Sequence, residues 1–169
     1  SVNIELPSGE SLAKLAPNKT KQAILTPMKS IQSAIAESKS GLVKYKHAEK
    51  FAPAGQSTQM IIGASPETDY QILHLTEGLY KKFSLKRVFF SAYIPVAEST
   101  LLPSLDTKPP LLREHRLYQA DWLLRYYHFE ADEILDAENQ DFNPFLDPKC
   151  NWAMNHMEQF PVEVNTASQ

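Results

Sequence analysis

Polar residues at the end of a strand-like segment are the first candidates for chemistry in this sequence. Glu5 stands near the end of the alternating segment Val2–Leu6, and Asn3 shares its face if that segment is a strand. Polar side chains that face the interior of an α/β fold are costly unless a ligand or a polar network meets them. Parallel barrels gather their ligand contacts at the carboxyl ends of strands. Glu5 and Asn3 are therefore candidates for ligand contact.

A glycine ends the second strand-like segment, Thr58–Gly63. Gly63 would let a ligand approach the backbone closely, or it would do no more than form the turn into the next helix, and the residues alone leave both open. Ser65 and Pro66 predict the start of that helix, with Ser65 as N-cap. The chain has only five glycines, in neither a Walker A nor a GxGxxG arrangement.

Cations and aromatic residues are mixed on the segment Leu111–Phe129, whose apolar spacing predicts an amphipathic helix. Cations beside aromatic rings can hold phosphates and stack bases, which makes three arginines candidates for nucleic-acid contact: Arg113, Arg116 and Arg125. In the simpler interpretation, Trp122 packs and the arginines face water or pair with Glu114 and Asp121.

The sequence contains no motif that indicates a metal site or a catalytic cysteine. Cys150 is the only cysteine, and the five histidines form no HExxH motif. Cys150 and His156 have the chemistry of a nucleophile pair but no accompanying signature. A single cysteine, a net charge of -3 and the lack of a long apolar segment indicate a cytoplasmic protein with no global basic field and no membrane span.

Three strand-like segments and the helices between them must position these candidates. The segments are Val2–Leu6, Thr58–Gly63 and Arg87–Ala92. The helical patterns cover Glu10–Leu15, Thr20–Ser38 with Pro27 as a kink or break, and Ser65–Phe83, and a polar connector follows over Lys39–Gly55. This alternation predicts adjacent parallel strands in chain order, with helices on one side.

Such a small sheet is incomplete. Three parallel strands can neither close a barrel nor bury both faces, so the rest of the sheet is expected from elsewhere. A strand pattern that opens the chain without a lead-in favours a cut inside a fold, although a trimmed natural N-terminus would look the same. Residues 1–105 are expected to form the α/β part and residues 106–169 a helical extension, with short helices over Asp132–Ala137 and Pro148–Phe160.

Long stretches of the chain resemble a family of radical S-adenosylmethionine enzymes described as DNA modification or repair proteins. The resemblance covers essentially the whole chain and is densest in Ser1–Pro7, Phe51–Asp69, Leu85–Val96, Pro109–Tyr127 and Phe160–Asn165. It implies a partial (βα)6 TIM-like barrel, of which this chain would hold strands four to six. It also implies S-adenosylmethionine and a [4Fe-4S] cluster in the intact protein.

The cluster ligands that the family carries in a CxxxCxxC motif are absent from this sequence, and a lone cysteine cannot replace three thiolates. The resemblance therefore implies a fragment that is inactive alone. Its implied partners are the N-terminal half of the barrel, DNA, and a protein resembling uracil-DNA glycosylase.

The resemblance also assigns cofactor contacts. Asn3 and Glu5 match positions that, in the family, contact the ribose or methionine part of S-adenosylmethionine. Gln59 replaces the first glycine of the family's GxIxG pattern, which puts the contact at that end in doubt. The positions that match those beside the adenine are Ile61, Gly63, Ser91, Ala92 and Tyr93.

The sequence therefore favours a fragment of a radical S-adenosylmethionine enzyme that contributes part of the cofactor pocket and whose substrate is a nucleic acid or a nucleotide. One alternative is a non-catalytic module that binds nucleic acid or protein through the Arg113–Arg125 helix. Another is a different barrel enzyme that holds a phosphate near Gly63 and Ser91.

Overall fold

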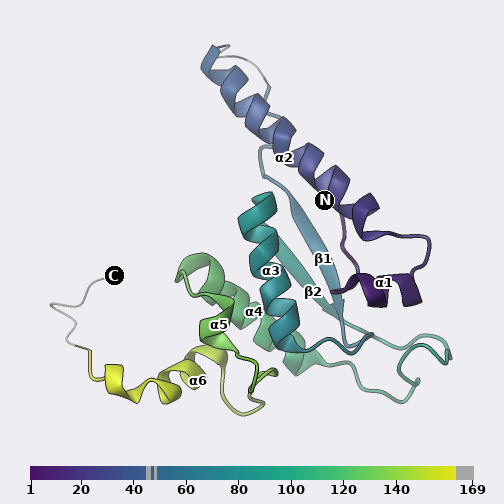
Figure 1. Ribbon diagram of the computed structural model, residues 1–169, viewed down its shortest axis with the longest axis vertical. Coiled ribbons are helices and arrows are strands. Elements are labelled where there is room, and N and C mark those ends of the chain that lie inside the picture. The colour runs from purple at the N-terminus through teal and green to yellow at the C-terminus, as the bar shows by residue number, and fades with distance from the viewer. Residues whose placement is uncertain (45–46, 48, 163–169) are drawn as a thin grey trace.

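The computed structural model describes residues 1–44, 47 and 49–162. Their fold is mixed α/β, with a small parallel sheet and six α-helices (Figure 1). The elements are α1 (Gly9–Leu15), α2 (Lys21–Lys44), β1 (Ser57–Ile62), α3 (Asp69–Phe83), β2 (Arg87–Ala92), α4 (Leu111–Tyr126), α5 (Ala131–Ile134) and α6 (Pro148–Asn155). Positions 163–165 of the family-like stretch Phe160–Asn165 lie outside the described residues.

The two strands confirm the parallel pairing expected from the sequence. β1 and β2 run parallel in register from the pair Ser57 and Arg87 to the pair Ile62 and Ala92. The connection between them passes through α3, as a parallel crossover requires. Gly63 follows the last residue of β1 instead of lying within the strand.

The first segment is adjacent to β1, but the prediction of a strand over Val2–Leu6 is wrong. Among the described residues its pairing is limited to an isolated parallel bridge between Glu5 and Met60. Glu5 has φ +67, and the Leu6 N–H donates to the Ile4 carbonyl oxygen at 2.8 Å. This i to i+2 hydrogen bond forms a γ-turn, which bends the backbone out of the ladder.

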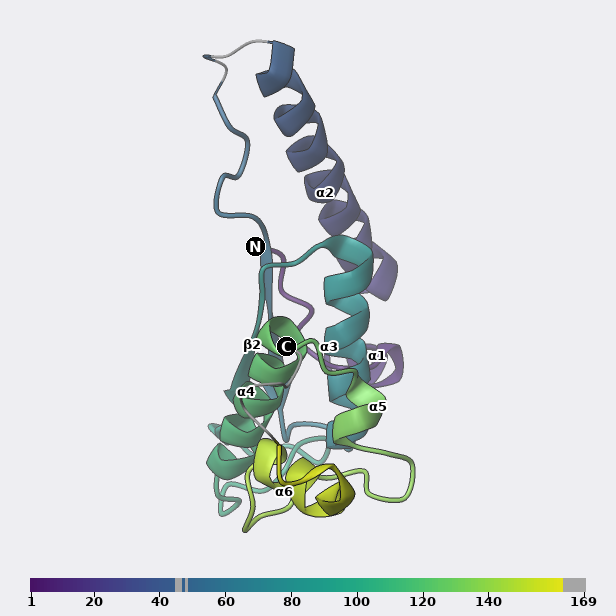
Figure 2. The same cartoon turned by 90° about the vertical axis from the view of Figure 1, so that its left-hand side faces the viewer.

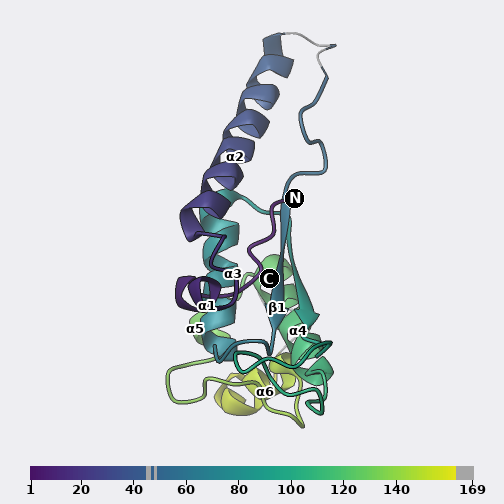
Figure 3. The same cartoon turned by 90° about the vertical axis from the view of Figure 1, so that its right-hand side faces the viewer.

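The two faces of the sheet differ in their cover. Helices α1, α2 and α3 lie on one side of the strands (Figure 2, Figure 3). The side chains buried on that side are Thr58, Met60, Ile62, Val88 and Phe90. On the other face, Gln59 and Ile61 are half-buried, and Arg87 and Phe89 are exposed. Parallel sheets are normally covered on both faces, whereas α1, α2 and α3 cover one face of this sheet and leave Arg87 and Phe89 exposed on the other.

The course of α2 differs from the sequence prediction. α2 runs unbroken past Pro27 and continues to Lys44, where a polar connector was expected from Lys39 onward. Ile24 and Met28 bury its first half against the core, and the rest of α2 extends beyond the sheet (Figure 1). The amphipathic first half holds the helix against the core. The polar residues that follow remain helical because polar side chains do not by themselves end a helix.

The start of α3 also differs, and the prediction of Ser65 as its N-cap is wrong. The Thr68 hydroxyl accepts from the Gln71 N–H at 3.3 Å. The Gln71 side chain in turn accepts from the Thr68 N–H at 3.1 Å. This reciprocal capping box satisfies two N–H groups at once and sets the helix start three residues after Pro66.

The C-terminal helices pack onto the α/β part. Leu117 of α4 is fully buried in the same cluster as Met60 and Phe90. The last two helices are shorter than expected: α5 ends at Ile134, and α6 gives way to a 3₁₀ turn over Met157–Gln159. Within the described ranges, no helix has the length and apolar character needed to cross a membrane.

Side chains close the outer edge of β2. Every second backbone N–H of the strand donates to a side-chain oxygen, in the pairs Val88 with Tyr80 at 3.0 Å, Phe90 with Tyr118 at 3.0 Å, and Ala92 with Glu114 at 2.5 Å. The Tyr118 hydroxyl also donates to the Phe90 carbonyl oxygen at 2.9 Å. These bonds replace a neighbouring strand, so the sheet ends here.

Candidate functional site

Most of the sequence-predicted cofactor residues lie at or near the carboxyl ends of β1, β2 and the segment Val2–Leu6, which is bridged to β1. The rim is defined here as Glu5, Ile61–Gly63 and Ser91–Tyr93. It includes Ile62, which the sequence did not single out, and leaves out Asn3, which precedes the bridge. The Glu5 N–H donates to the Gln59 carbonyl at 3.1 Å, and the Ile61 N–H donates to the Glu5 carbonyl at 2.7 Å. Ile61 stands opposite Ser91 in the register. Parallel pairing thus brings together residues that lie far apart in the sequence.

The polar side chains of the rim already have partners within the chain. The Glu5 carboxylate accepts from Lys19 Nζ at 2.8 Å, and its side chain is 27% exposed. The Gln59 amide donates to the Ser91 hydroxyl at 2.8 Å. Asn3 is exposed just before the bridge. A ligand at the rim would therefore meet the partly exposed Glu5 carboxylate and the hydrogen-bonded pair of the Gln59 amide and the Ser91 hydroxyl.

Gly63 serves the turn after β1. Its φ is +89, a conformation that side chains rarely adopt, and a Cβ added there would lie 2.7 Å from Cγ of Pro110. The space beside Gly63 is thus occupied by the Pro110 ring. A larger residue at Gly63 would disturb this packing whether or not a ligand binds, so its substitution is a poor test of ligand contact.

Ala92, the last residue of β2, and Tyr93, the residue after it, have their backbone N–H groups in use. The Ala92 N–H donates to Glu114, and the Tyr93 N–H donates to the Ile62 carbonyl at 2.8 Å. The Tyr93 ring packs against the hydrophobic core. A ligand at this point of the rim would meet carbonyl oxygens and side chains instead of free N–H donors.

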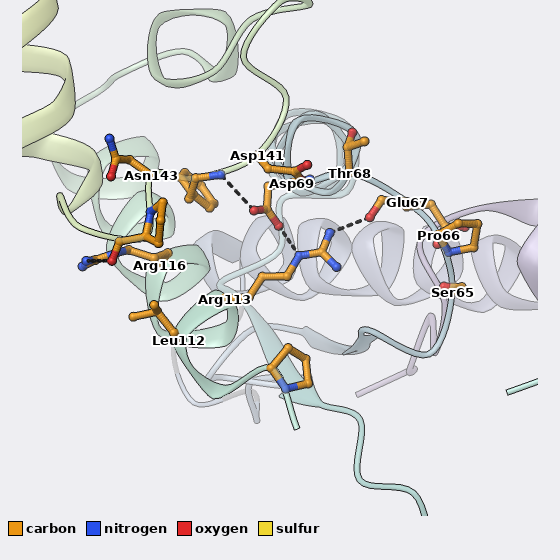
Figure 4. A pocket seen from close by; sticks show the side chains of 13 residues that line it. Ser65, Pro66, Glu67, Thr68, Asp69, Leu112, Arg113, Arg116, Asp141 and Asn143 are labelled. Carbon is orange, nitrogen blue, oxygen red and sulfur yellow. Dashed lines mark hydrogen bonds and ion pairs between the residues drawn. The ribbon is translucent and has the colours of Figure 1, made fainter. Parts of the chain in front are cut away.

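Arg113 lines a hollow of about 540 Å³ between the start of α3, the start of α4 and the loop around Phe142 (Figure 4). Its Nε donates to the Asp69 carboxylate at 2.5 Å and a terminal nitrogen donates to the Glu67 carbonyl at 2.5 Å. Asp69 also accepts from the Phe142 N–H at 3.0 Å. Arg113 and Asp69 together therefore join the start of α4, the start of α3 and the loop around Phe142.

The other two arginines also contact the protein. Arg125 lies 2.7 Å from the Asp121 carboxylate, which is fully buried, and this pair confirms the simpler interpretation for Arg125. Arg116 donates to Gln119 at 2.8 Å. Nucleic-acid contact by Arg113, Arg116 and Arg125 stays a prediction, and for Arg113 and Arg125 it would compete with an ion pair to a buried aspartate.

Several ionisable groups in or beside these contacts have shifted pKa values, among them Asp69, Glu67 and Tyr80. Burial raises the pKa of Asp69 against the opposing charge of Arg113. Burial acts to raise the pKa of Glu67 too, but hydrogen bonds from serine side chains, Ser11 first, outweigh it and bring the pKa below its usual value. Burial, then the charge of Asp121, raises the pKa of Tyr80, so its hydroxyl stays protonated and donates to Asp121.

Glu67 and Asp69 were missed as site residues from the sequence. Glu67 is 8% exposed, and its carboxylate accepts from the hydroxyls of Ser8 and Ser11 at the start of α1. It thereby links the segment after the Glu5 bridge to the loop after β1. The available signal was the position of two carboxylates in the connection between a buried strand and the next helix, where parallel folds place polar contacts.

A metal centre finds no ligand set in the part of the chain that the structure describes, where no three His, Cys, Asp or Glu side chains are grouped to hold an ion. Cys150 is exposed on α6. Comparisons of this chain with protein-family models, curated proteins and solved structures find no match.

Proposed function

We propose that this chain forms the last strands of a larger parallel α/β barrel and part of an S-adenosylmethionine pocket, as in radical S-adenosylmethionine enzymes. The observation that carries the proposal is the asymmetry of the sheet. One face is covered by helices, and the outer edge of β2 is closed by side chains. The other face presents Gln59, Ile61 and Phe89. A parallel sheet of this kind needs further strands, added beside the Glu5 segment.

The rim residues suit the polar parts of this cofactor. The Glu5 carboxylate would accept hydrogen bonds from ribose hydroxyls or from the methionine ammonium, exchanging its contact with Lys19. Asn3 is exposed two residues before Glu5, while Ile61 and Ala92 would give apolar contact to the adenine. When bound beside a reduced cluster, S-adenosylmethionine supplies radical chemistry at a substrate C–H bond; the residues of this chain bind and orient it.

The iron–sulfur cluster itself does not fit this chain. Cluster irons are held by several thiolates, and the exposed Cys150 is the sequence's only cysteine. Its ligands would come from the strands that complete the barrel. The resemblance extends the proposal to a cytoplasmic enzyme acting on a nucleic acid or nucleotide beside a glycosylase-like partner.

Titration of the isotope-labelled chain with S-adenosylmethionine, followed by amide chemical shifts, tests the proposal. We expect weak binding, with a Kd of about 1 mM because only part of the pocket is present, and shifts concentrated at Glu5, Ile61–Gly63 and Ser91–Tyr93. Glu5→Gln should weaken binding about tenfold, since one charge-assisted hydrogen bond contributes about 1.5 kcal/mol. Glu138→Gln, at an exposed position, is the matched control.

Three outcomes would contradict the proposal. The first is the absence of shifts at millimolar cofactor, and the second is a set of shifts away from the rim. The third is a response of Gly63 and Ser91 to inorganic phosphate but not to S-adenosylmethionine, which would indicate a barrel enzyme of another kind.

A further inference from the structure

We propose that the chain binds single-stranded nucleic acid in a lysine-lined hollow between α2, the connector before β1 and the start of β2. This hollow has a volume of about 520 Å³ and is here called the lysine groove. It is lined by Lys39, Lys50 and Lys86, with Phe51 and Phe83 among its apolar residues. It lies at the amino ends of the strands, opposite the rim, and does not depend on the proposed cofactor role.

The charge of the groove differs from that of the whole protein. The chain carries a net charge of -3, yet among the described residues that line the groove there are three lysines and no aspartate or glutamate. None of the three makes an ion pair with another described residue. By contrast, Arg113 and Arg125 of α4 are held by buried aspartates. A lysine without an ion pair can bind a phosphate without first breaking another interaction. An arginine in a buried pair would have to give up its aspartate, which costs free energy.

The walls of the groove are held by specific contacts. The buried Gln56 amide donates to the Met28 carbonyl of α2 at 3.2 Å and to the Phe83 carbonyl at the end of α3 at 2.9 Å. The Phe51 N–H donates to the Ser38 hydroxyl of α2 at 2.9 Å. These bonds join the connector to both helices, so that the groove is part of the folded structure.

Gly55 makes room for one of the lysines. Its φ is +80, and a Cβ added there would lie 2.5 Å from Cγ and 3.4 Å from Cε of Lys86. The Lys86 stem therefore passes directly over the Gly55 backbone, and both residues line the groove. The sequence indicated only a polar connector here, since Lys39, Lys50 and Lys86 are too far apart along the chain to suggest a cluster.

Phe51 indicates the form of the ligand. Its side chain is 50% exposed beside the lysines. An exposed aromatic ring next to cations is the usual platform of single-strand binders, where phosphates meet the charges and an unpaired base stacks on the ring. Paired bases in a duplex cannot stack on it in this way. A single-stranded nucleic acid thus matches both the charge and the exposed ring.

Fluorescence anisotropy with a labelled thymidine oligonucleotide at low ionic strength tests the proposal. The triple variant Lys39→Gln, Lys50→Gln and Lys86→Gln should bind at least about tenfold more weakly. Its plot of log affinity against log salt should be shallower by about two. The control triple variant Lys14→Gln, Lys21→Gln and Lys108→Gln has the same net charge and should bind as the unaltered chain does.

A single substitution then separates stacking from charge. Phe51→Ala should weaken binding of the oligonucleotide by about fivefold or more, because stacking on one aromatic ring contributes about 1 kcal/mol or more. It should leave binding of an abasic oligonucleotide unchanged. The proposal is overturned if the unaltered chain does not bind, if both triple variants lose the same affinity, or if Phe51→Ala affects neither oligonucleotide. Circular dichroism of each variant checks that the fold is kept.

Discussion

On the outer edge of β2, three backbone N–H groups meet oxygens of Tyr80, Tyr118 and Glu114, whereas beside β1 the chain makes one bridge and turns away at Glu5. The first edge is closed by side chains that lie on helices already packed in the core. The second is secured by Glu67, which joins the α1 start to the loop after β1. The outer edge of β2 is thus closed to another strand, so the further strands that we propose would have to join at the edge beside β1.

Removing the buried charge behind the closed edge should have the largest effect. Asp121 is fully buried, accepts from Tyr80 and pairs with Arg125. Asp121→Asn leaves a half-buried guanidinium without its counter-charge, and we expect the free energy of unfolding to fall by about 3 kcal/mol. Urea unfolding measures it, with the exposed Asp106→Asn as control. A loss no larger than that of the control would mean that the edge does not depend on this pair.

The Tyr118 hydroxyl, which makes the hydrogen bonds to β2 that a neighbouring strand would make, can be removed by a single substitution. Tyr118→Phe takes away both hydrogen bonds to Phe90, and we expect a loss of about 2 kcal/mol and faster hydrogen exchange of the Phe90 amide. Tyr127→Phe changes an exposed tyrosine and should have little effect. Unchanged exchange at Phe90 would contradict the edge-closing role of Tyr118.

The contribution of Glu67 to the free energy of unfolding should depend on pH. The hydrogen bonds to Glu67 lower its pKa below the usual value of 4.5. Its contribution is therefore complete above that value and disappears as the pH falls through the lowered pKa. We expect Glu67→Gln to cost about 1.5 kcal/mol at neutral pH, with the difference narrowing below about pH 4. A difference that is the same at both pH values would show that the charge of Glu67 is not involved.

The smallest effect is expected at the γ-turn itself. Glu5 has a positive φ, so Glu5→Gly should relieve backbone strain. Glu5→Ala removes the same contact with Lys19 but keeps the strain. We therefore expect the glycine variant to be more stable than the alanine variant by about 0.5–1 kcal/mol in urea unfolding. Equal stability of the two variants would mean that the turn is unstrained.

Part of this fold is determined by the sequence alone. β1 and β2 follow from short runs of apolar and β-branched residues, and their parallel pairing follows from the helix between them. The amphipathic spacing of Ile24 and Met28 likewise places α2 on the core. These are local signals, because each depends on residues within one or two turns of each other. For the same reason the sequence pattern was enough to place Ile61–Gly63 and Ser91–Tyr93 at the ends of strands, but not Glu5, whose segment forms no strand.

Only the tertiary structure decided which polar side chains are paired with other residues of the chain and which are left to meet a ligand. Arg113 and Asp69 are 44 positions apart, and nothing in either neighbourhood indicates their pairing. The γ-turn at Glu5 is likewise invisible in an alternating segment that has the pattern of a strand. Lys39, Lys50 and Lys86 come together only because residues 49–56 run back beside α2 toward β1 (Figure 1). Pairing of charges depends on distance in space, which a one-dimensional pattern does not contain.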